Sequence, residues 1–211
     1  MSVRRGVFVT IEGGEGSGKS TLIHGLAEKL EAKGLTVVST REPGGTPLAE
    51  NVRDLVLSPP DDDPWSPLAE ALLMNAARSD HVDKKISPAL MRGDWVICDR
   101  FSDSTLVYQG ISGVRNEILL AMQTEVTSLA RPDITFILDA EPEALLGRRQ
   151  TRATSDVFER RPIEFHRKVR EAFLKIAEAD PERCAVLDAM LSPSQLLGSA
   201  VAILEERAVS V

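Results

Sequence analysis

The sequence predicts an α/β fold, in which a five-stranded parallel sheet lies between layers of helices. The first observation is that short β-branched and apolar runs alternate with segments whose apolar residues recur at helical spacing. The second is size, because 211 residues, 43% of them hydrophobic, can supply one large core. We therefore expect a single three-layer domain, residues 1–211, with right-handed crossovers between strands.

The predicted strands span residues 7–11, 35–38, 95–98, 134–138 and 184–187. The first of them is β-branched or aromatic throughout, as is typical of a strand buried on both faces. Apolar residues three or four positions apart predict helices over residues 22–30, 118–129 and 165–176. The Pro- and Asp-rich segment 58–64 predicts a surface loop between two helices.

Composition excludes several classes of protein. With 25 basic and 32 acidic side chains, the net charge of −7 gives no overall attraction to nucleic acid or to an anionic membrane. No apolar run approaches the roughly 18 residues of a membrane span. Two cysteines are too few for a disulfide framework. We expect a cytoplasmic globular protein that binds neither nucleic acid nor membrane.

The strongest motif follows the first predicted strand and opens the first predicted helix. Residues 13–20 match G-x-x-x-x-G-K-[ST], whose backbone N–H groups surround a phosphate at a helix N-terminus. A lysine there follows the charge of the transferring phosphoryl group, and the last hydroxyl is a Mg²⁺ ligand. The motif predicts binding of a nucleoside triphosphate, which the resemblance described below implies is ATP, by Gly13, Gly14, Glu15, Gly16, Ser17, Gly18, Lys19, Ser20 and the adjoining Thr21.

Further polar residues follow the second and third predicted strands. Ligands of open parallel sheets bind beyond the carboxyl ends of the strands, so Asp99, Arg100 and Arg41 should lie beside the phosphate-binding loop. A carboxylate suits the hydration shell of Mg²⁺, and arginines suit bridging phosphates. An [NT]-K-x-D element, which a guanine-specific GTPase needs, is missing from the sequence. Residues 148–161 carry five Arg against one Asp and one Glu, the reverse of the overall balance.

Taken together, these blocks resemble the bacterial thymidylate kinase family. The glycine-rich loop with an acidic third position, the T-R-E-P-G-G-T block at 40–46 and the D-R-[FYH]-x-x-S-x-x-x-Y-Q-G block at 99–110 occur in the family's order. The resemblance covers residues 7–196. It implies transfer of the ATP γ-phosphoryl group to dTMP with Mg²⁺, a P-loop kinase fold with an arginine-bearing lid at about 148–161, and a homodimer formed through helices near 67–90 and 118–129.

The resemblance also implies roles for individual residues. Lys19, Glu15, Arg100 and Arg152 would be catalytic, and Arg148 would pack near adenine. Ser20 would hold Mg²⁺ directly and Asp99 through water. The dTMP site would consist of Glu15, Arg41, Met74, Arg78, Arg100, Thr105, Tyr108 and Gln109, with Arg78 at the pyrimidine O4, Thr105 near N3–H, Tyr108 excluding a ribose 2′-hydroxyl, and Gln109 on the same loop.

The sequence departs from the family pattern at two positions. Met74 stands where the family usually has a phenylalanine that stacks on the base, and Val157 stands where members often have an arginine after the lid aspartate. We assign the histidines at 24, 81 and 166 to surface or capping positions, with no part in catalysis. The alternatives left open are a kinase of another nucleotide or deoxynucleoside and a non-catalytic P-loop switch.

Overall fold

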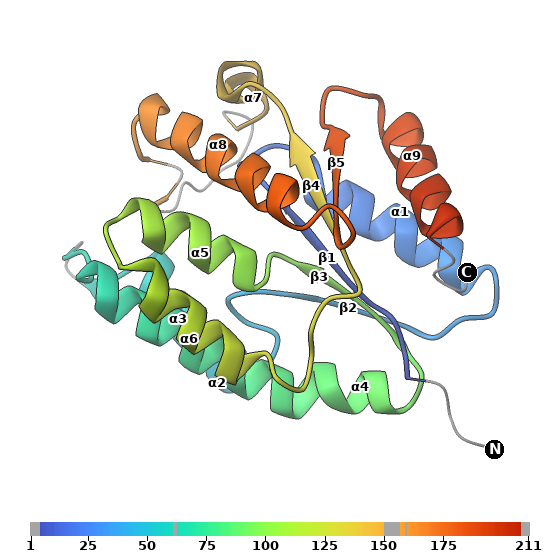
Figure 1. Ribbon diagram of the computed structural model, residues 1–211, viewed down its shortest axis with the longest axis horizontal. Coiled ribbons are helices and arrows are strands. Elements are labelled where there is room, and N and C mark those ends of the chain that lie inside the picture. Colours follow the sequence, from blue (N-terminus) through green and yellow to red (C-terminus); the bar gives the residue numbers. More distant parts are fainter. Residues whose placement is uncertain (1–4, 61–62, 150–156, 159, 208–211) are drawn as a thin grey trace.

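The computed structural model describes residues 5–60, 63–149, 157–158 and 160–207 (Figure 1). Its sheet is parallel, with the strand order β2-β3-β1-β4-β5. The strands are β1 (Phe8–Gly13), β2 (Val37–Arg41), β3 (Trp95–Asp99), β4 (Ile134–Asp139) and β5 (Cys184–Asp188). The predicted five-stranded parallel sheet is confirmed, and its order puts the phosphate-binding loop in the middle of the carboxyl edge.

Helices cover both faces of this sheet (Figure 1). On one face lie α1 (Lys19–Glu31) and α9 (Pro193–Glu206). On the other lie α5 (Ser102–Ile111), α8 (Ile163–Ala179) and α4 (Ser87–Met91), the last preceded by a π-helical turn, η2 (Val82–Ile86). The remaining helices are α2 (Pro47–Leu57), α3 (Pro67–His81), α6 (Asn116–Val126) and α7 (Pro142–Arg149). No described helix could cross a bilayer.

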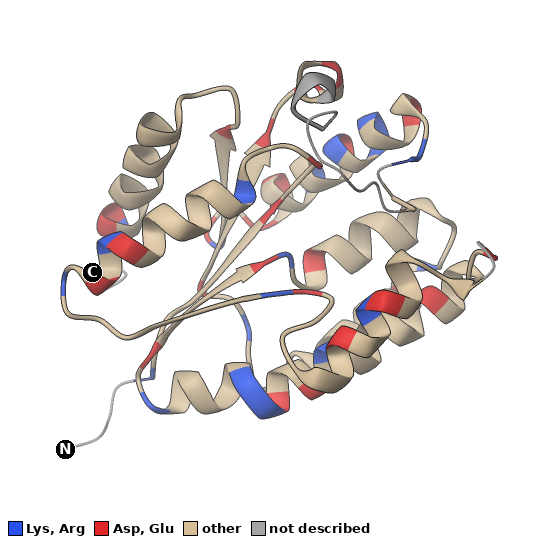
Figure 2. Cartoon of the chain, turned by 180° about the vertical axis from the view of Figure 1, so that it is seen from behind, with Lys and Arg blue, Asp and Glu red and all other residues tan. Residues whose placement is uncertain are grey.

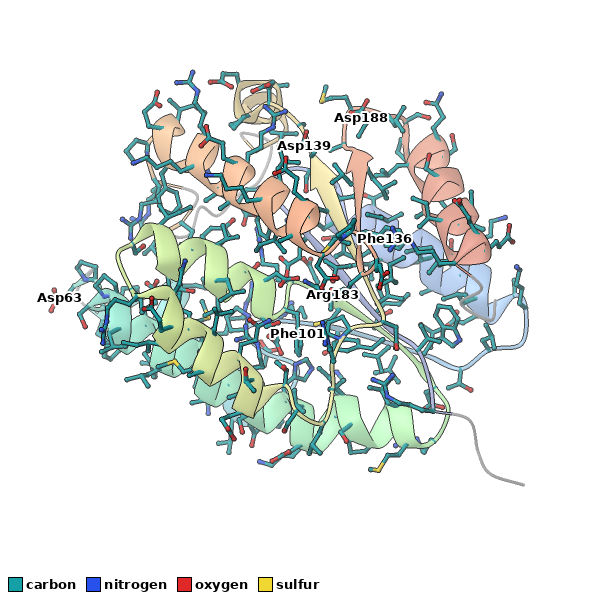
Figure 3. The ribbon with its side chains drawn as sticks, viewed as in Figure 1. Asp63, Phe101, Phe136, Asp139, Arg183 and Asp188 are labelled. Atoms are coloured by element: carbon teal, nitrogen blue, oxygen red, sulfur yellow. The ribbon has the colours of Figure 1, made fainter. Side chains whose placement is uncertain are left out.

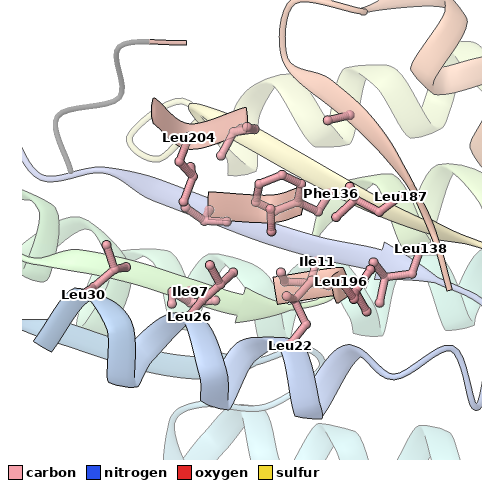
Figure 4. Packing of buried hydrophobic residues seen from close by; sticks show 14 of the residues in the cluster. Ile11, Leu22, Leu26, Leu30, Ile97, Phe136, Leu138, Leu187, Leu196 and Leu204 are labelled. Atoms are coloured by element: carbon pink, nitrogen blue, oxygen red, sulfur yellow. The ribbon is translucent and has the colours of Figure 1, made fainter. Parts of the chain in front are cut away.

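The larger apolar core lies between the sheet and the α1–α9 layer. Leu22, Leu26 and Leu30 project from successive turns of α1 toward β1 and β3, and Phe136 of β4 is fully buried among them (Figure 4). Each buried side chain of this size contributes about 1.5–3 kcal/mol relative to an exposed one. This layer holds α1, and therefore the loop in front of it, against the strands.

The opposite face of the sheet is apolar at one end and polar toward the other. Thr10 shares a buried 2.7 Å hydrogen bond with Thr135 of β4. Arg183 donates to Thr135 at 2.7 Å and to Asp103 of α5 at 2.6 Å, deep between the layers (Figure 3). Because these polar side chains satisfy one another, α5 is attached at a defined position over the strands.

Ion pairs fix the outer helices to the sheet. Lys and Arg are interspersed with Asp and Glu along these helices (Figure 2). Arg170 of α8 donates to Asp139 at 2.7 Å, and Arg167 pairs with Glu143 of α7. The Arg170–Asp139 pair is partly buried. The Arg167–Glu143 pair is exposed, and such pairs contribute only about 0–1 kcal/mol each, so it orients the two helices more than it stabilises the fold.

Most element boundaries differ from the sequence prediction by one to three residues; the first strand, for example, runs from Phe8 to Gly13 rather than over residues 7–11. The second strand begins at Val37 rather than at residue 35, because the Leu35 N–H donates to the Leu30 carbonyl and closes the end of α1. The helix predicted to reach residue 129 ends at Val126. The segment 58–64 does connect α2 and α3 as predicted, although its residues 61–62 lie outside the described part of the chain.

Candidate active site

The phosphate-binding loop runs from the end of β1 into α1, as the motif predicts. Gly13 has φ +132°, and a Cβ there would lie 2.5 Å from the Leu138 carbonyl oxygen of β4, so only glycine fits. Lys19 opens α1, and its Nζ donates to the carbonyl oxygens of Gly14 (3.0 Å) and Gly13 (3.3 Å). Burial, followed by the Arg100 charge, lowers the Lys19 pKa. An arriving phosphate would favour the charged amine.

Arg100 follows β3 and lies beside this loop. Its backbone is left-handed, with φ +65°, and its N–H donates to the Ile11 carbonyl of β1 at 2.9 Å. The guanidinium pairs with Glu15 of the loop and donates to Ser104 at 3.2 Å. It also lies 5.2 Å from the centre of the Tyr108 ring. The sequence placed Asp99 and Arg100 beside the loop, and the structure has them there.

A buried carboxylate that sequence reasoning missed supports this turn. Glu12, at the end of β1, is fully buried and accepts hydrogen bonds from the Phe101 N–H (2.7 Å) and the Ser104 hydroxyl (2.6 Å). Burial, and next the charge of Asp103, raise its pKa to about 7, although Arg100 and the two hydrogen bonds oppose the rise. The signal in the sequence that could have revealed Glu12 is an acidic residue at the end of an otherwise apolar strand.

One cavity of about 580 Å³ joins the loop to the second half of the predicted site. Thirteen of the predicted residues line it: Glu15, Gly16, Gly18, Lys19, Ser20, Arg41, Met74, Arg78, Asp99, Arg100, Thr105, Tyr108 and Gln109. Gly13 and Gly14 line a smaller neighbouring cavity, Ser17 is buried and Thr21 is exposed. Arg152 and the Arg148 side chain lie outside the described part of the chain. The cavity walls also include Glu42, Arg53, Leu57 and Phe158, which sequence reasoning did not single out.

The far end of the cavity is built around Arg78 of α3, which is only 3% exposed. Its Nε donates to Glu42 at 2.7 Å, and its Nη2 donates to Thr105 at 2.9 Å and to the Phe101 carbonyl at 3.1 Å. Gln109 donates to Glu70 of α3 at 2.8 Å.

The expectation that Gln109 lies on a loop was wrong. Thr105, Tyr108 and Gln109 all belong to helix α5. This helix presents Thr105 and Tyr108 to the cavity one turn apart, as residues three positions apart on a helix share a face. A rigid helix therefore supplies this wall of the cavity.

The histidines were predicted at surface or capping positions; His24 is exposed, whereas the other two are buried. His81 is 0% exposed and His166 is 4% exposed. His81 lies between Glu42 (3.0 Å) and Thr40 (2.8 Å). Helical spacing alone did not indicate this burial, because the partners of His81 lie outside its own helix, on strand β2 and in the turn that follows it.

The residues at the loop fit a magnesium ion that arrives with its nucleotide. The Asp99 Oδ1 and Ser17 Oγ atoms are buried without a hydrogen-bond partner among the described residues. Hydroxyl and carboxylate oxygens are the ligands that Mg²⁺ prefers, and it keeps several waters. Among the residues that the structure describes, no cluster of three or more His, Cys, Asp or Glu forms a closed metal cage.

The Glu12 carboxyl makes stability depend on pH. Its pKa is about 7 in the folded chain and 4.5 as an ordinary glutamate, so the folded chain favours the protonated carboxyl. The contribution of this group to the free energy of unfolding is therefore fully present below pH 4.5 and is lost as pH rises through 7. We expect wild type to lose about 3 kcal/mol relative to Glu12→Gln over that range. Urea unfolding of both proteins at a series of pH values measures this, and a stability difference that stays constant with pH would contradict it.

Known proteins are similar to this chain in sequence and in architecture. A family model described as thymidylate kinase matches residues 11–199. A thymidylate kinase from Bradyrhizobium sp. (strain BTAi1) is 51% identical over 193 residues, covering 90% of this chain and 85% of that protein. One from Caulobacter vibrioides is 45% identical over 186 residues, covering 88% and 89%.

A solved structure agrees. The crystal structure of thymidylate kinase from Ehrlichia chaffeensis matches with a TM-score of 0.78 and 35% identity, covering 95% of this chain and 99% of that one. The match in family model, sequence and fold extends over nearly the whole chain. The chain therefore belongs to the thymidylate kinase family.

Proposed function

We propose that this protein transfers the γ-phosphoryl group of ATP to dTMP, giving dTDP for dTTP and DNA synthesis. The observation that carries the proposal is the single cavity with a phosphate-binding loop at one end and Arg78 at the other. A P-loop protein that only hydrolyses ATP needs the phosphate-binding loop but not the Arg78 end of the cavity. Two ends joined at Arg100 suit a donor and an acceptor whose phosphates meet there.

Charge neutralisation is the main chemical task in this transfer, because the acceptor phosphate oxygen is already ionised. Lys19 and the loop N–H groups would hold the ATP phosphates, and Arg100 would bridge to the acceptor phosphate. Glu15 would orient Arg100, which its contact with the guanidinium supports. Arg41, 56% exposed and 3.0 Å from Glu50, would assist from the rim.

The deoxynucleoside of dTMP would lie between α3 and α5. Arg78 would donate to O4 of the pyrimidine, and Thr105, whose oxygen already accepts from Arg78, would keep a lone pair for N3–H. Met74 would pack on the ring face. Tyr108 contacts Phe158 edge-on, with 5.4 Å between ring centres, which supports a fixed wall where a ribose 2′-hydroxyl would otherwise fit.

Mg²⁺ would be held by Ser20 and, through water, by Asp99. When bound, it supplies positive charge that neutralises and orients the phosphate oxygens of ATP. We further propose that Arg148 and Arg152 act in a lid at about 148–161, as arginines that exclude water and complete the neutralisation. With Val157 in place of an arginine, Arg152 would carry more of that charge.

We propose a homodimer formed through α3 and α6. These two helices pack against each other and expose Leu68, Leu72 and Leu120 to roughly half of their full extent. Exposed leucines that cluster on adjacent helices favour a protein interface. We also propose a cytoplasmic location, which the free state of both buried cysteines, Cys98 and Cys184, supports.

An acceptor panel tests the reaction. Transfer from ATP should be fastest with dTMP when it is compared with dUMP, dCMP, UMP and thymidine under the same conditions. The measurement is the initial rate of product formation together with the rate of ATP loss without acceptor. A preference for another acceptor, or ATP hydrolysis that needs none, would contradict the proposal.

Lys19→Ala should nearly abolish transfer, because the transition-state charge loses its mobile cation while the loop backbone remains. The expected loss in kcat is well over tenfold, corresponding to more than about 1.4 kcal/mol. Lys29→Ala, an exposed lysine of the same helix, is the matched control and should retain full activity. If Lys19→Ala kept more than about a tenth of kcat, the role would be wrong.

Met74→Phe should tighten dTMP binding by about 0.5–1.5 kcal/mol, because an aromatic face stacks on the base better than a thioether. Met74 lines the cavity and is only partly buried, so the cavity has room for the larger phenylalanine ring. Calorimetric titration with dTMP, alongside thermal unfolding of the free protein, measures both effects. Unchanged binding with lower stability would show that Met74 is a core residue.

A further inference from the structure

A buried network of Glu42 and His81 lies behind Arg78 and fixes the direction of the arginine. Glu42 is 4% exposed, and its two carboxylate oxygens take different partners. One accepts from Arg78 Nε at 2.7 Å and the other contacts His81 Nδ1 at 3.0 Å. A carboxylate oxygen only accepts hydrogen bonds, so the His81 proton lies on Nδ1.

The far side of the His81 ring is fixed as well. Its Nε2 lies 2.8 Å from the Thr40 hydroxyl at the end of β2. A Cβ on Gly45 would lie 2.3 Å from the same nitrogen, so the glycine leaves the space that the ring fills. The turn after β2 and the end of α3 are thereby joined through one imidazole.

This network leaves Arg78 with little freedom. Four hydrogen bonds, to Glu42, Asn75, the Phe101 carbonyl and Thr105, use four of the five N–H donors of a guanidinium. Among the described residues, one N–H on Nη1 is left without a partner. A single donor in a fixed direction matches a carbonyl oxygen and opposes an amino group.

We propose that His81 and Glu42 are positioning residues that set pyrimidine selectivity without touching the nucleotide. Glu42 fixes the Arg78 guanidinium, and His81 fixes Glu42. The site then accepts a base with an oxygen at position 4 and rejects one with an amino group there. This inference rests on the proposed function, in which Arg78 reads the base.

Two substitutions of His81 separate positioning from packing. Both His81→Asn and His81→Gln remove the ring. The Asn amide nitrogen falls near the place of Nδ1 and can still donate to Glu42, whereas the Gln nitrogen falls near Nε2 and cannot. We expect His81→Gln to raise the KM for dTMP and to lower the dTMP/dCMP ratio of kcat/KM, each by about fivefold or more.

His81→Gln should leave the KM for ATP and the kcat within about twofold of the wild-type values. His81→Asn should retain most of the wild-type selectivity, although it should lose about as much thermal stability as His81→Gln. In Glu42→Gln, the amide NH₂ group faces either Arg78 Nε or His81 Nδ1, both of which are donors, so one of the two hydrogen bonds is lost. This variant should change selectivity in the same direction as His81→Gln. His24→Gln, an exposed histidine, is the matched control and should change nothing.

Two results would overturn the inference. One is an unchanged dTMP/dCMP ratio in both His81→Gln and Glu42→Gln. The other is an equal loss of selectivity in His81→Asn and His81→Gln. The wild-type acceptor panel separates this from the proposed function: a wild type that does not prefer dTMP refutes the function, whereas a selective wild type with equally selective variants refutes only the positioning role.

Discussion

The hydrogen bonds of the buried Glu12 carboxylate are the interaction on which the rest of the site depends. Parallel pairing places the end of β1 beside the end of β3, with Ile11 in register with Asp99. Glu12 then holds the turn after β3 through the Phe101 N–H and the Ser104 hydroxyl. A left-handed residue other than glycine costs about 1–3 kcal/mol and persists only where its surroundings determine it. These bonds let Arg100 keep that conformation beside the phosphate-binding loop.

The charges around this point are arranged for an anion. Lys19 and Arg100 are close enough that the arginine helps to lower the lysine pKa, and only Glu15 and other nearby carboxylates offset them. A phosphate bound between the two cations would remove their mutual repulsion and add attraction to both. The proximity of these two cations is therefore a reason for the donor and acceptor phosphates of the proposed reaction to meet here.

Sequence reasoning reached the parts of the site that local patterns determine. The strands, the phosphate-binding loop and the position of Arg100 follow from hydrophobic runs, a motif with its flanks and the rule that ligands bind at the carboxyl edge. It missed Glu12, and it assigned His81 to a surface or capping position, because the partners of both residues lie far away in the chain. Burial of a polar residue depends on those distant partners. The family resemblance was taken to place Gln109 on a loop, whereas this residue lies on helix α5.

The central claim is that one cavity holds the donor and acceptor phosphates in a single fixed arrangement. Calorimetric titration with a dinucleotide, adenosine joined to thymidine through a chain of phosphates, tests this most directly. If both halves fit together, the linked ligand should bind about 10²–10⁴ times more tightly than ATP or dTMP alone, because the second half binds intramolecularly. An affinity no better than that of ATP would show that the two ends of the cavity cannot be occupied at once, and would contradict the account.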